Sequence, residues 1–360
     1  MIQKTSRACA EWLKSFRAKC IAGAIATCTL ITLAMPIQAQ HKPGSPYVFN
    51  NNPEVQTFIQ AMRDAHGFKE EDLIKAFAQT KHQPDAQRYM SPPSGQFKKS
   101  WSVYRSRYLD ALRIDEGLKF WTQHRASLER AQDAYGVPAE IIVAIIGVET
   151  VYGRVTGNFR VMDVLATLAF DYPRRAAFFK EELEQYLLLA REQNVDLFSV
   201  RGSFAGAIGL PQFMPGSIRR HAVDFNQDGH IDLRGSATDA IGSVGSFLLN
   251  HGWQAGKPTH QVVSVEQSPL IAEQLAVGIK PHTSIERLGQ AGVKFMDSTA
   301  PVDNKDQWVL IEFPTPDMPT EYIAASNNFY VVTRYNQSSF YALAVIDLAN
   351  ALKEKRGRQN

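Results

Sequence analysis

The feature that most constrains this chain is an almost wholly apolar segment that ends in a carboxylate. Residues 138–148 read Pro-Ala-Glu-Ile-Ile-Val-Ala-Ile-Ile-Gly-Val, and Glu149 follows directly. Pro138 suits the first turn of a helix. The isoleucines and the last valine of the segment recur at helical spacing. The sequence therefore predicts a buried helix with Glu149 at its C-terminal end.

The position of Glu149 predicts a perturbed carboxyl group. Burial disfavours the anionic form of a carboxylic acid, and so does the negative end of a helix dipole. Both effects raise the pKa of Glu149, and a carboxyl that keeps its proton near neutral pH suits general acid catalysis. An ordinary Glu near a helix end, with Gly153 stopping the helix, fits this segment equally well.

A glycine-rich segment follows about fifty residues later and predicts a ligand-contacting loop. Residues 203–217 read Ser-Phe-Ala-Gly-Ala-Ile-Gly-Leu-Pro-Gln-Phe-Met-Pro-Gly-Ser. Gly206 and Gly209 let a backbone approach a ligand closely. Gln212 can donate and accept hydrogen bonds at once, and an apolar Phe-Met pair follows it.

Taken together, the two segments resemble the lytic murein transglycosylases, specifically the B type. The matching motifs are Glu149-Thr-x-Tyr-Gly and Gly206-Ala-x-Gly-x-x-Gln-Phe-Met-Pro. The resemblance continues through residues 171–175, 224–232, 240–243 and 334–341, and it spans roughly residue 50 to the C-terminus. The order and spacing of these motifs carry the resemblance, because each motif alone is weak to moderate.

The resemblance implies a mostly α, α+β fold with a lysozyme-like catalytic core, a helical domain and a small β domain. Periodicity by itself indicates only a mostly helical chain with one β patch. The expected organisation is a signal peptide (1–39), a linker (40–52), an α-helical domain (53–135), a catalytic core with an EF-hand-like loop at 224–239 (136–255), a small β domain (256–320), and a return to the core with a C-terminal helix (321–360). Three prolines predict a loop over residues 82–95, and periodicity predicts one long helix over 171–193.

The resemblance also implies a mechanism with a single carboxylate. Glu149 would protonate the β-1,4 oxygen between N-acetylmuramic acid and N-acetylglucosamine, then take the proton of the muramoyl 6-hydroxyl and close a 1,6-anhydro ring without water. Hydrolytic glycosidases usually need a second carboxylate, and neither Asp163 nor Asp171 has an obvious claim to that role. A hydrolytic muramidase using the same acid, or a non-catalytic murein-binding scaffold, remains an alternative.

Substrate-binding residues follow from the matched motifs. Among the residues that match the family's motifs, the tyrosines and the asparagine are expected around Glu149 and the groove. The serine and the glutamine are expected at the sugar, and the Phe-Met pair in the groove wall. The two arginines suit a muramoyl or peptide carboxylate, because a guanidinium is forked. The simpler alternatives are a core aromatic for Tyr341, a solvated helix start for the arginines and a cap for Ser203. The full set is Tyr104, Arg174, Arg175, Ser203, Gln212, Phe213, Met214, Tyr335, Asn336 and Tyr341.

A separate acidic motif predicts a structural calcium site. Residues 224–232 match the first positions of an EF-hand loop, and the family's longer loop would be closed by an aspartate at position 239. The alternative is a polar Asn-Asp-Gly turn without metal. The chemistry itself is expected to need no cofactor. The expected ligands are Asp224, Asn226, Asp228, His230 through its carbonyl, and Asp239.

The N-terminal segment explains the apparent basicity of the chain. The formal net charge is +3, and removing residues 1–39, with five basic residues and one acidic, brings it to about −1. No nucleic-acid partner is therefore expected, and peptidoglycan strands are the implied partner of a monomer. All three cysteines also lie in this segment, which excludes disulfides and thiolate chemistry from the mature chain. A soluble periplasmic protein is favoured over a lipoprotein anchored at Cys28.

Overall fold

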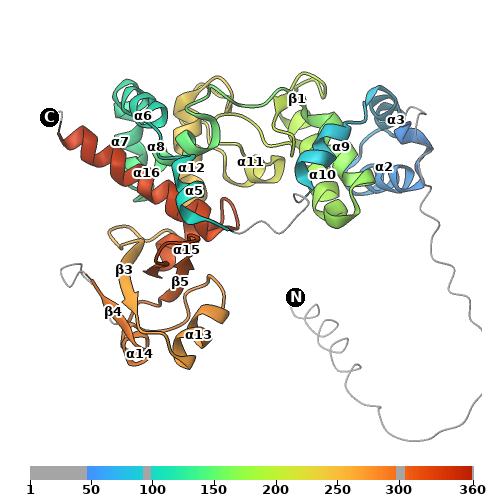
Figure 1. Ribbon diagram of the computed structural model, residues 1–360. Coiled ribbons are helices and arrows are strands. Elements are labelled where there is room, and N and C mark those ends of the chain that lie inside the picture. Colours follow the sequence, from blue (N-terminus) through green and yellow to red (C-terminus); the bar gives the residue numbers. More distant parts are fainter. Residues whose placement is uncertain (1–46, 92–98, 297–304, 359–360) are drawn as a thin grey trace, which may run out of the picture. The chain divides into compact units, whose positions relative to one another are not determined.

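The computed structural model describes residues 47–91, 99–296 and 305–358, so the expected signal peptide lies outside the described residues. The fold is mostly helical α+β, as expected (Figure 1). Residues 47–52, predicted as linker, belong to the folded part, because the 3₁₀ turn η1 (Phe49–Asn51) buries its phenylalanine. The helices are α2 Pro53–His66, α3 Glu70–Gln79, α4 Pro84–Met90, α5 Trp101–Ser106, α6 Ala111–Gln123, α7 Arg125–Tyr135, α8 Ala139–Thr150, α9 Val161–Asp171, α10 Ala176–Glu192, α11 Pro215–His221, α12 Ala237–Asn250, α13 Pro269–Ala276, α14 Ile285–Gln290, α15 Asn327–Thr333 and α16 Ser339–Gly357.

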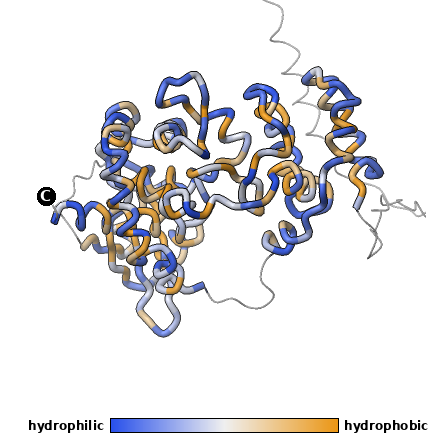
Figure 2. Tube along the Cα trace, turned by 90° about the horizontal axis from the view of Figure 1, so that it is seen from above, coloured by the Kyte–Doolittle hydropathy of each residue, from blue (hydrophilic) through white to orange (hydrophobic). Residues whose placement is uncertain are grey.

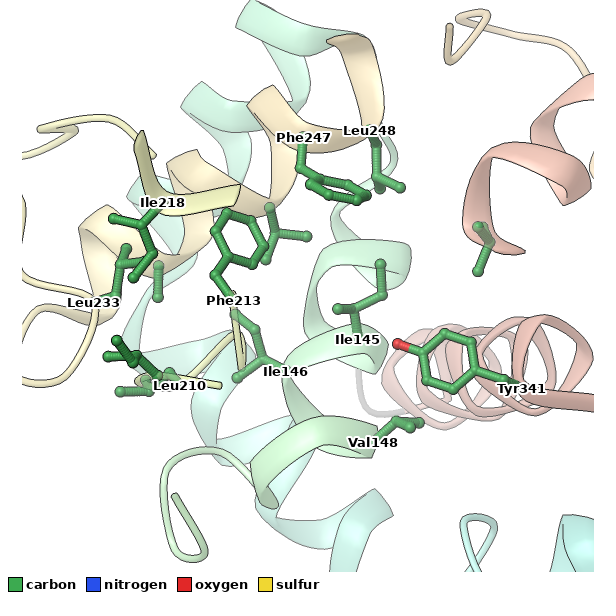
Figure 3. Packing of buried hydrophobic residues seen from close by; sticks show 14 of the residues in the cluster. Ile145, Ile146, Val148, Leu210, Phe213, Ile218, Leu233, Phe247, Leu248 and Tyr341 are labelled. Atoms are coloured by element: carbon green, nitrogen blue, oxygen red, sulfur yellow. The ribbon is translucent and has the colours of Figure 1, made fainter. Parts of the chain in front are cut away.

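Helix α8 is the centre of the main core. Every residue of α8 is buried except Glu140 and Glu149. Such a helix is apolar all round because neighbours cover every side. Helices α6, α7, α12 and α16 pack against it, and its apolar side chains meet those of α12 and the 206–213 segment (Figure 3).

The predicted helical domain at 53–135 is not one unit in the structure. Helices α2 to α4 lie with α9 and α10, whereas α5 to α7 pack among α8, α12 and α16 (Figure 1). Ion pairs such as Lys180–Glu54 (2.7 Å) join α2 to α10. Periodicity shows that a helix has an apolar face, but it does not say which partner covers that face, so the division was missed.

Two local predictions were also wrong. Residues 84–90, expected in a loop, form α4, because Pro84 occupies the first helical turn, where it needs no N–H partner. The expected long helix at 171–193 is broken after Asp171. Tyr172 precedes a proline and is held out of the helical region, and the 3₁₀ turn η2 (Pro173–Arg175) then leads into α10.

The small β domain has its own sheet and its own core. Its four antiparallel strands run in the order β4-β3-β6-β5. Because β6 pairs with both β3 and β5, the domain extends past the predicted boundary at 320. Trp308, Ile271 and Leu288 are fully buried in its core. The strands are β3 His260–Val265, β4 Val293–Phe295, β5 Val309–Phe313 and β6 Glu321–Ala325, and a separate two-stranded ribbon joins β1 Phe159–Arg160 to β2 Arg201–Gly202.

Hydrophobic stretches gather where the helices pack together, and hydrophilic residues line the outer turns (Figure 2). Within the described residues, no single helix is long and apolar enough to cross a membrane. The bent pair Arg125–Tyr135 and Ala139–Thr150 meets that test by length and composition.

Candidate active site

Glu149 occupies the last turn of α8, where its side chain is partly exposed. Burial of its surroundings raises the pKa of this carboxyl from 4.5 to about 7, and a hydrogen bond from Tyr341 opposes the rise. The Tyr341 hydroxyl donates to Glu149 Oε1 at 2.6 Å, and its ring points from α16 toward α8 (Figure 3). The sequence-based expectation of a carboxyl protonated near neutral pH therefore agrees with the geometry.

Three tyrosines surround this carboxyl. Tyr335 stacks on Tyr341 with ring centroids 6.3 Å apart and planes at 13°. Burial raises the pKa of Tyr335, Tyr341 and Tyr104, and the nearby charge of Glu149 raises each further. All three phenols therefore stay protonated and neutral. Tyr335, expected to hydrogen-bond near Glu149, instead donates to the carbonyl of Pro211 at 2.5 Å.

The polar side chains of the glycine-rich segment support the loop itself. Gln212 has a left-handed backbone (φ 50°), and its Nε2 donates to the carbonyls of Gly209 (2.9 Å) and Thr156 (3.2 Å). Ser203 Oγ accepts from the backbone N–H of Ala207 at 3.1 Å. Ser203 therefore closes the turn that follows it, and its expected contact with the sugar stays a prediction.

Phe213, Met214 and Asn336 were also expected to contact substrate. Phe213, predicted in the groove wall, is buried, because its ring packs between Phe247 and Tyr335, and Met214 beside it is half-buried. Asn336 is exposed, and its carbonyl accepts from a nearby backbone N–H; no hydrogen bond found in the described residues links its side chain to Glu149.

The two arginines lie in the 3₁₀ turn η2, directly before α10. Both are exposed, and the Arg175 guanidinium lies 4.3 Å from the ring centroid of Phe178. Their expected role at a muramoyl or peptide carboxylate stays a prediction.

The two aspartates considered as second catalytic carboxylates have structural partners. Asp163 is buried and binds Arg160 through both oxygens at 2.7 and 2.8 Å. Asp171 binds His82 at 2.8 Å. The first contact lies at the N-terminal end of α9, and the second joins its C-terminal end to the residues before α4. In the part of the chain that the structure describes, no second carboxylate contributes to the pKa of Glu149.

The acidic motif forms a loop at residues 224–235, called the polar loop below. The carboxylate of Asp224 accepts from the N–H groups of Asp228 (3.1 Å) and Gly229 (2.8 Å), and Asn226 donates to Asp228 at 2.8 Å. These oxygen donors suit a hard cation such as Ca²⁺. The described residues hold no group of three acidic, His or Cys side chains poised on a metal.

Asp239, predicted to close the metal site, forms hydrogen bonds to the backbone of the polar loop. It is fully buried, and its two oxygens accept from the N–H groups of Phe225, Asn226 and Asp232 at 2.9–3.1 Å. The side chain therefore holds the two ends of the polar loop together from inside. The spacing of acidic residues does not show whether a carboxylate faces the loop centre or the core.

Sequence reasoning missed the unusual turn after Glu149. Val151 and Tyr152 both have left-handed backbones, at φ 50° and 58°. The Tyr152 ring fills a slot between α6 and α8, and a Cβ on Gly147 would lie 2.4 Å from its hydroxyl. A glycine in the middle of a buried helix was the available signal, because it marks a close approach by another group.

Comparisons with known proteins agree with this fold and site. A family described as "Transglycosylase SLT domain" matches residues 50–350. The membrane-bound lytic murein transglycosylase B of Escherichia coli (strain K12) is 42% identical over 315 residues, 84% of each chain. The crystal structure of soluble lytic transglycosylase SltB1 from Pseudomonas aeruginosa is 43% identical, with a TM-score of 0.78 over 85% of this chain and 100% of that one. The Escherichia coli lytic transglycosylase Slt35 in complex with calcium is 41% identical, with a TM-score of 0.76 over 85% and 94%.

These matches and the site together define the class of peptidoglycan-degrading lytic transglycosylases. Glu149 at the end of a buried helix and the glycine-rich segment beside it are the features on which the sequence resemblance rested. Within that class the chain belongs to the lytic murein transglycosylase B family.

Proposed function

We propose that this enzyme cleaves the β-1,4 bond between N-acetylmuramic acid and N-acetylglucosamine with Glu149 as its only catalytic carboxyl. The observation that carries the proposal is the pKa of Glu149, raised by burial to about 7. A carboxyl with this pKa holds a proton at neutral pH, and it can also act as a base once the proton is given away.

The hydrogen bond from Tyr341 assigns roles to the two oxygens of Glu149. Because Tyr341 donates to Oε1, we assign the acidic proton to Oε2, which would face the glycosidic oxygen of a bound strand. After the proton transfer, Glu149 is an anion, and a hydrogen bond from a neutral donor to an anion is stronger than one to a neutral acid. Tyr341 therefore stabilises the charge that develops during bond cleavage.

The second step returns the proton to Glu149. The muramoyl 6-hydroxyl is tethered to the reacting carbon, and effective molarities of about 10⁵ M or more are reached by such intramolecular attack. Bulk water cannot compete if the groove orients that hydroxyl. Ser203, Gln212, Met214 and Tyr104 would supply groove contacts. The P. aeruginosa relative SltB3, 30% identical, was solved with NAG-anhNAM-pentapeptide and supports an anhydro product.

Two further parts of the proposal concern ions and location. We propose that the polar loop binds one structural Ca²⁺ through Asp224, Asn226, Asp228, the His230 carbonyl and Asp239, supported by their oxygen chemistry and by the calcium complex of Slt35. We also propose that residues 1–39 are removed and that the remaining chain acts as a monomer in the periplasm, since this segment has a basic start and an apolar centre.

Digestion of purified sacculi in ¹⁸O water tests the reaction. We expect muropeptides ending in 1,6-anhydro-N-acetylmuramic acid and free of ¹⁸O, and no products from Glu149→Gln. Because a single acid–base residue typically contributes about 10²–10⁴-fold, the variant should lose at least that much activity. Products with ¹⁸O at a reducing end would show a hydrolytic muramidase. Undigested sacculi with the native enzyme would show a binding scaffold.

A further inference from the structure

The residue after the catalytic acid, Thr150, has three hydrogen-bond partners although it is completely buried. Its hydroxyl donates to the carbonyl of Leu210 at 2.9 Å, with the α8 carbonyl of Ile146 at 3.2 Å as a second acceptor. The same oxygen accepts from the N–H of Gly153 at 3.0 Å. One hydroxyl thus joins the end of α8, the turn that follows it and the glycine-rich segment.

The backbone of Leu210 forms a second hydrogen bond, through its N–H. Its N–H donates to the carbonyl of Leu233, in the polar loop, at 2.8 Å. The approach is so close that a Cβ on Gly209 would lie 2.3 Å from that carbonyl oxygen. Leu210 lies between Leu233 and Ile146 of α8 (Figure 3). Two hydrogen bonds, joined through the backbone of Leu210, therefore connect the polar loop to the residue beside the acid.

The turn after Glu149 needs such an anchor. Val151 and Tyr152 are both left-handed, a conformation that side-chain-bearing residues adopt only where surrounding contacts enforce it. The Gly153–Thr150 hydrogen bond closes this turn, and the Leu210 hydrogen bond fixes it against the glycine-rich segment. The direction of the Glu149 side chain depends on where this helix end lies.

We propose that Thr150 is the positioning residue of Glu149, and that it connects the catalytic carboxyl to the polar loop through the peptide of Leu210. The inference rests on the proposed function, because it concerns the acid of that reaction. Thr150 does not touch substrate. It acts by holding the end of α8 so that Glu149 meets Tyr341 and the glycosidic oxygen at the same time.

Thr150→Val tests the first half of the proposal, because it keeps the shape and removes the hydroxyl. A misplacement of about 1 Å costs on the order of 10²-fold in rate, so we expect kcat to fall about 10- to 100-fold with KM little changed. The alkaline limb of the kcat/KM profile, set by Glu149 among Tyr104, Tyr335 and Tyr341, should also move. Thr150→Ser restores the hydroxyl and should return kcat to within about threefold of the native enzyme.

The chain offers a matched control in Thr167 on α9. It is equally buried, donates to the carbonyl of Asp163 at 2.7 Å and accepts from the N–H of Gln83 at 2.9 Å. Thr167→Val should lower the melting temperature as Thr150→Val does, yet leave kcat and the pH profile unchanged. An equal loss of kcat in both variants, or a native kcat and pH profile in Thr150→Val, would overturn the proposal.

A double-mutant cycle tests the connection to the polar loop. Asp228→Ala removes a loop carboxylate that accepts from the N–H of His230 at 2.9 Å. We expect it to lower kcat about threefold in the native background and to have no effect in Thr150→Val, since coupled residues give non-additive changes. Additive effects would refute the connection. Absence of anhydro products from the native enzyme would instead refute the proposed function.

Discussion

The raised pKa of Glu149 predicts that the active-site carboxyl destabilises the folded enzyme at neutral pH. Burial raises this pKa from 4.5 to about 7, so between these values the folded state binds more protons than the unfolded state. The free energy of unfolding then falls as pH rises through this window. A tenfold change in an acid dissociation constant corresponds to about 1.4 kcal/mol, so the raised pKa costs about 3 kcal/mol above pH 7. Glu149→Gln has no charge to bury, and we expect it to be about 3 kcal/mol more stable than the native enzyme at about pH 8.

Urea unfolding of both proteins from about pH 4 to about pH 8 measures this difference, because the midpoint and slope give the free energy of unfolding. The difference in free energy of unfolding between the two proteins should be near zero at the acidic end and should reach its full size near neutral pH. Glu129→Gln, on the exposed face of α7 where Glu129 pairs with Arg125 at 2.6 Å, is the control for the same substitution at a solvated carboxyl. Parallel curves for the native enzyme and Glu149→Gln would refute the reasoning, since they would mean that burial does not perturb the acid.

Three other predictions concern neighbouring contacts. Tyr341→Phe removes the donor that lowers the pKa of Glu149. A hydrogen bond to a charged group is worth about 1.5–3 kcal/mol, so the alkaline limb of the kcat/KM profile should move up by about 1–2 pH units. An unmoved or lowered limb would contradict this prediction. CaCl₂ should raise the melting temperature relative to chelator, and Asp224→Ala with Asp228→Ala should abolish the gain; identical curves would favour a metal-free turn. Gly147→Ala would place a methyl 2.4 Å from the Tyr152 hydroxyl and should cost about 1–3 kcal/mol by overpacking, whereas an unchanged melting temperature would show that the slot is loose.

Local signals were enough to predict the elements that carry the acid. Helix α2 begins at Pro53, the first residue of the predicted helical domain, and Asn52 caps it by accepting from the N–H of Glu54. Helix α8 was predicted from its apolar run, and its end was marked by Glu149 and Gly153. Caps, prolines and periodicity act within a few residues, so they are readable from the chain alone.

The contacts around the acid could not be predicted in the same way. Tyr335 and Tyr341 are the same residue type six positions apart, yet one hydroxyl binds Pro211 and the other binds Glu149. Asp239 likewise accepts from three backbone N–H groups of the polar loop, which the spacing of acidic residues does not show. Which way a side chain points depends on where α15, α16 and the glycine-rich turn meet in space, and no spacing rule encodes that.

Two opposing effects set the pKa of Glu149 near neutrality, and both are needed if one carboxyl performs both proton transfers. Burial alone would leave an acid that holds its proton too firmly to become a base, whereas a solvated carboxyl, with a pKa near 4.5, would have no proton to give at neutral pH. The apolar α8 supplies the burial, and Tyr341, 192 positions further along the chain, supplies the opposing hydrogen bond. The C-terminal helix α16 is therefore part of the proposed proton-transfer machinery. A change that shifts α16 against α8 alters the pKa of Glu149 without any direct contact with its carboxyl.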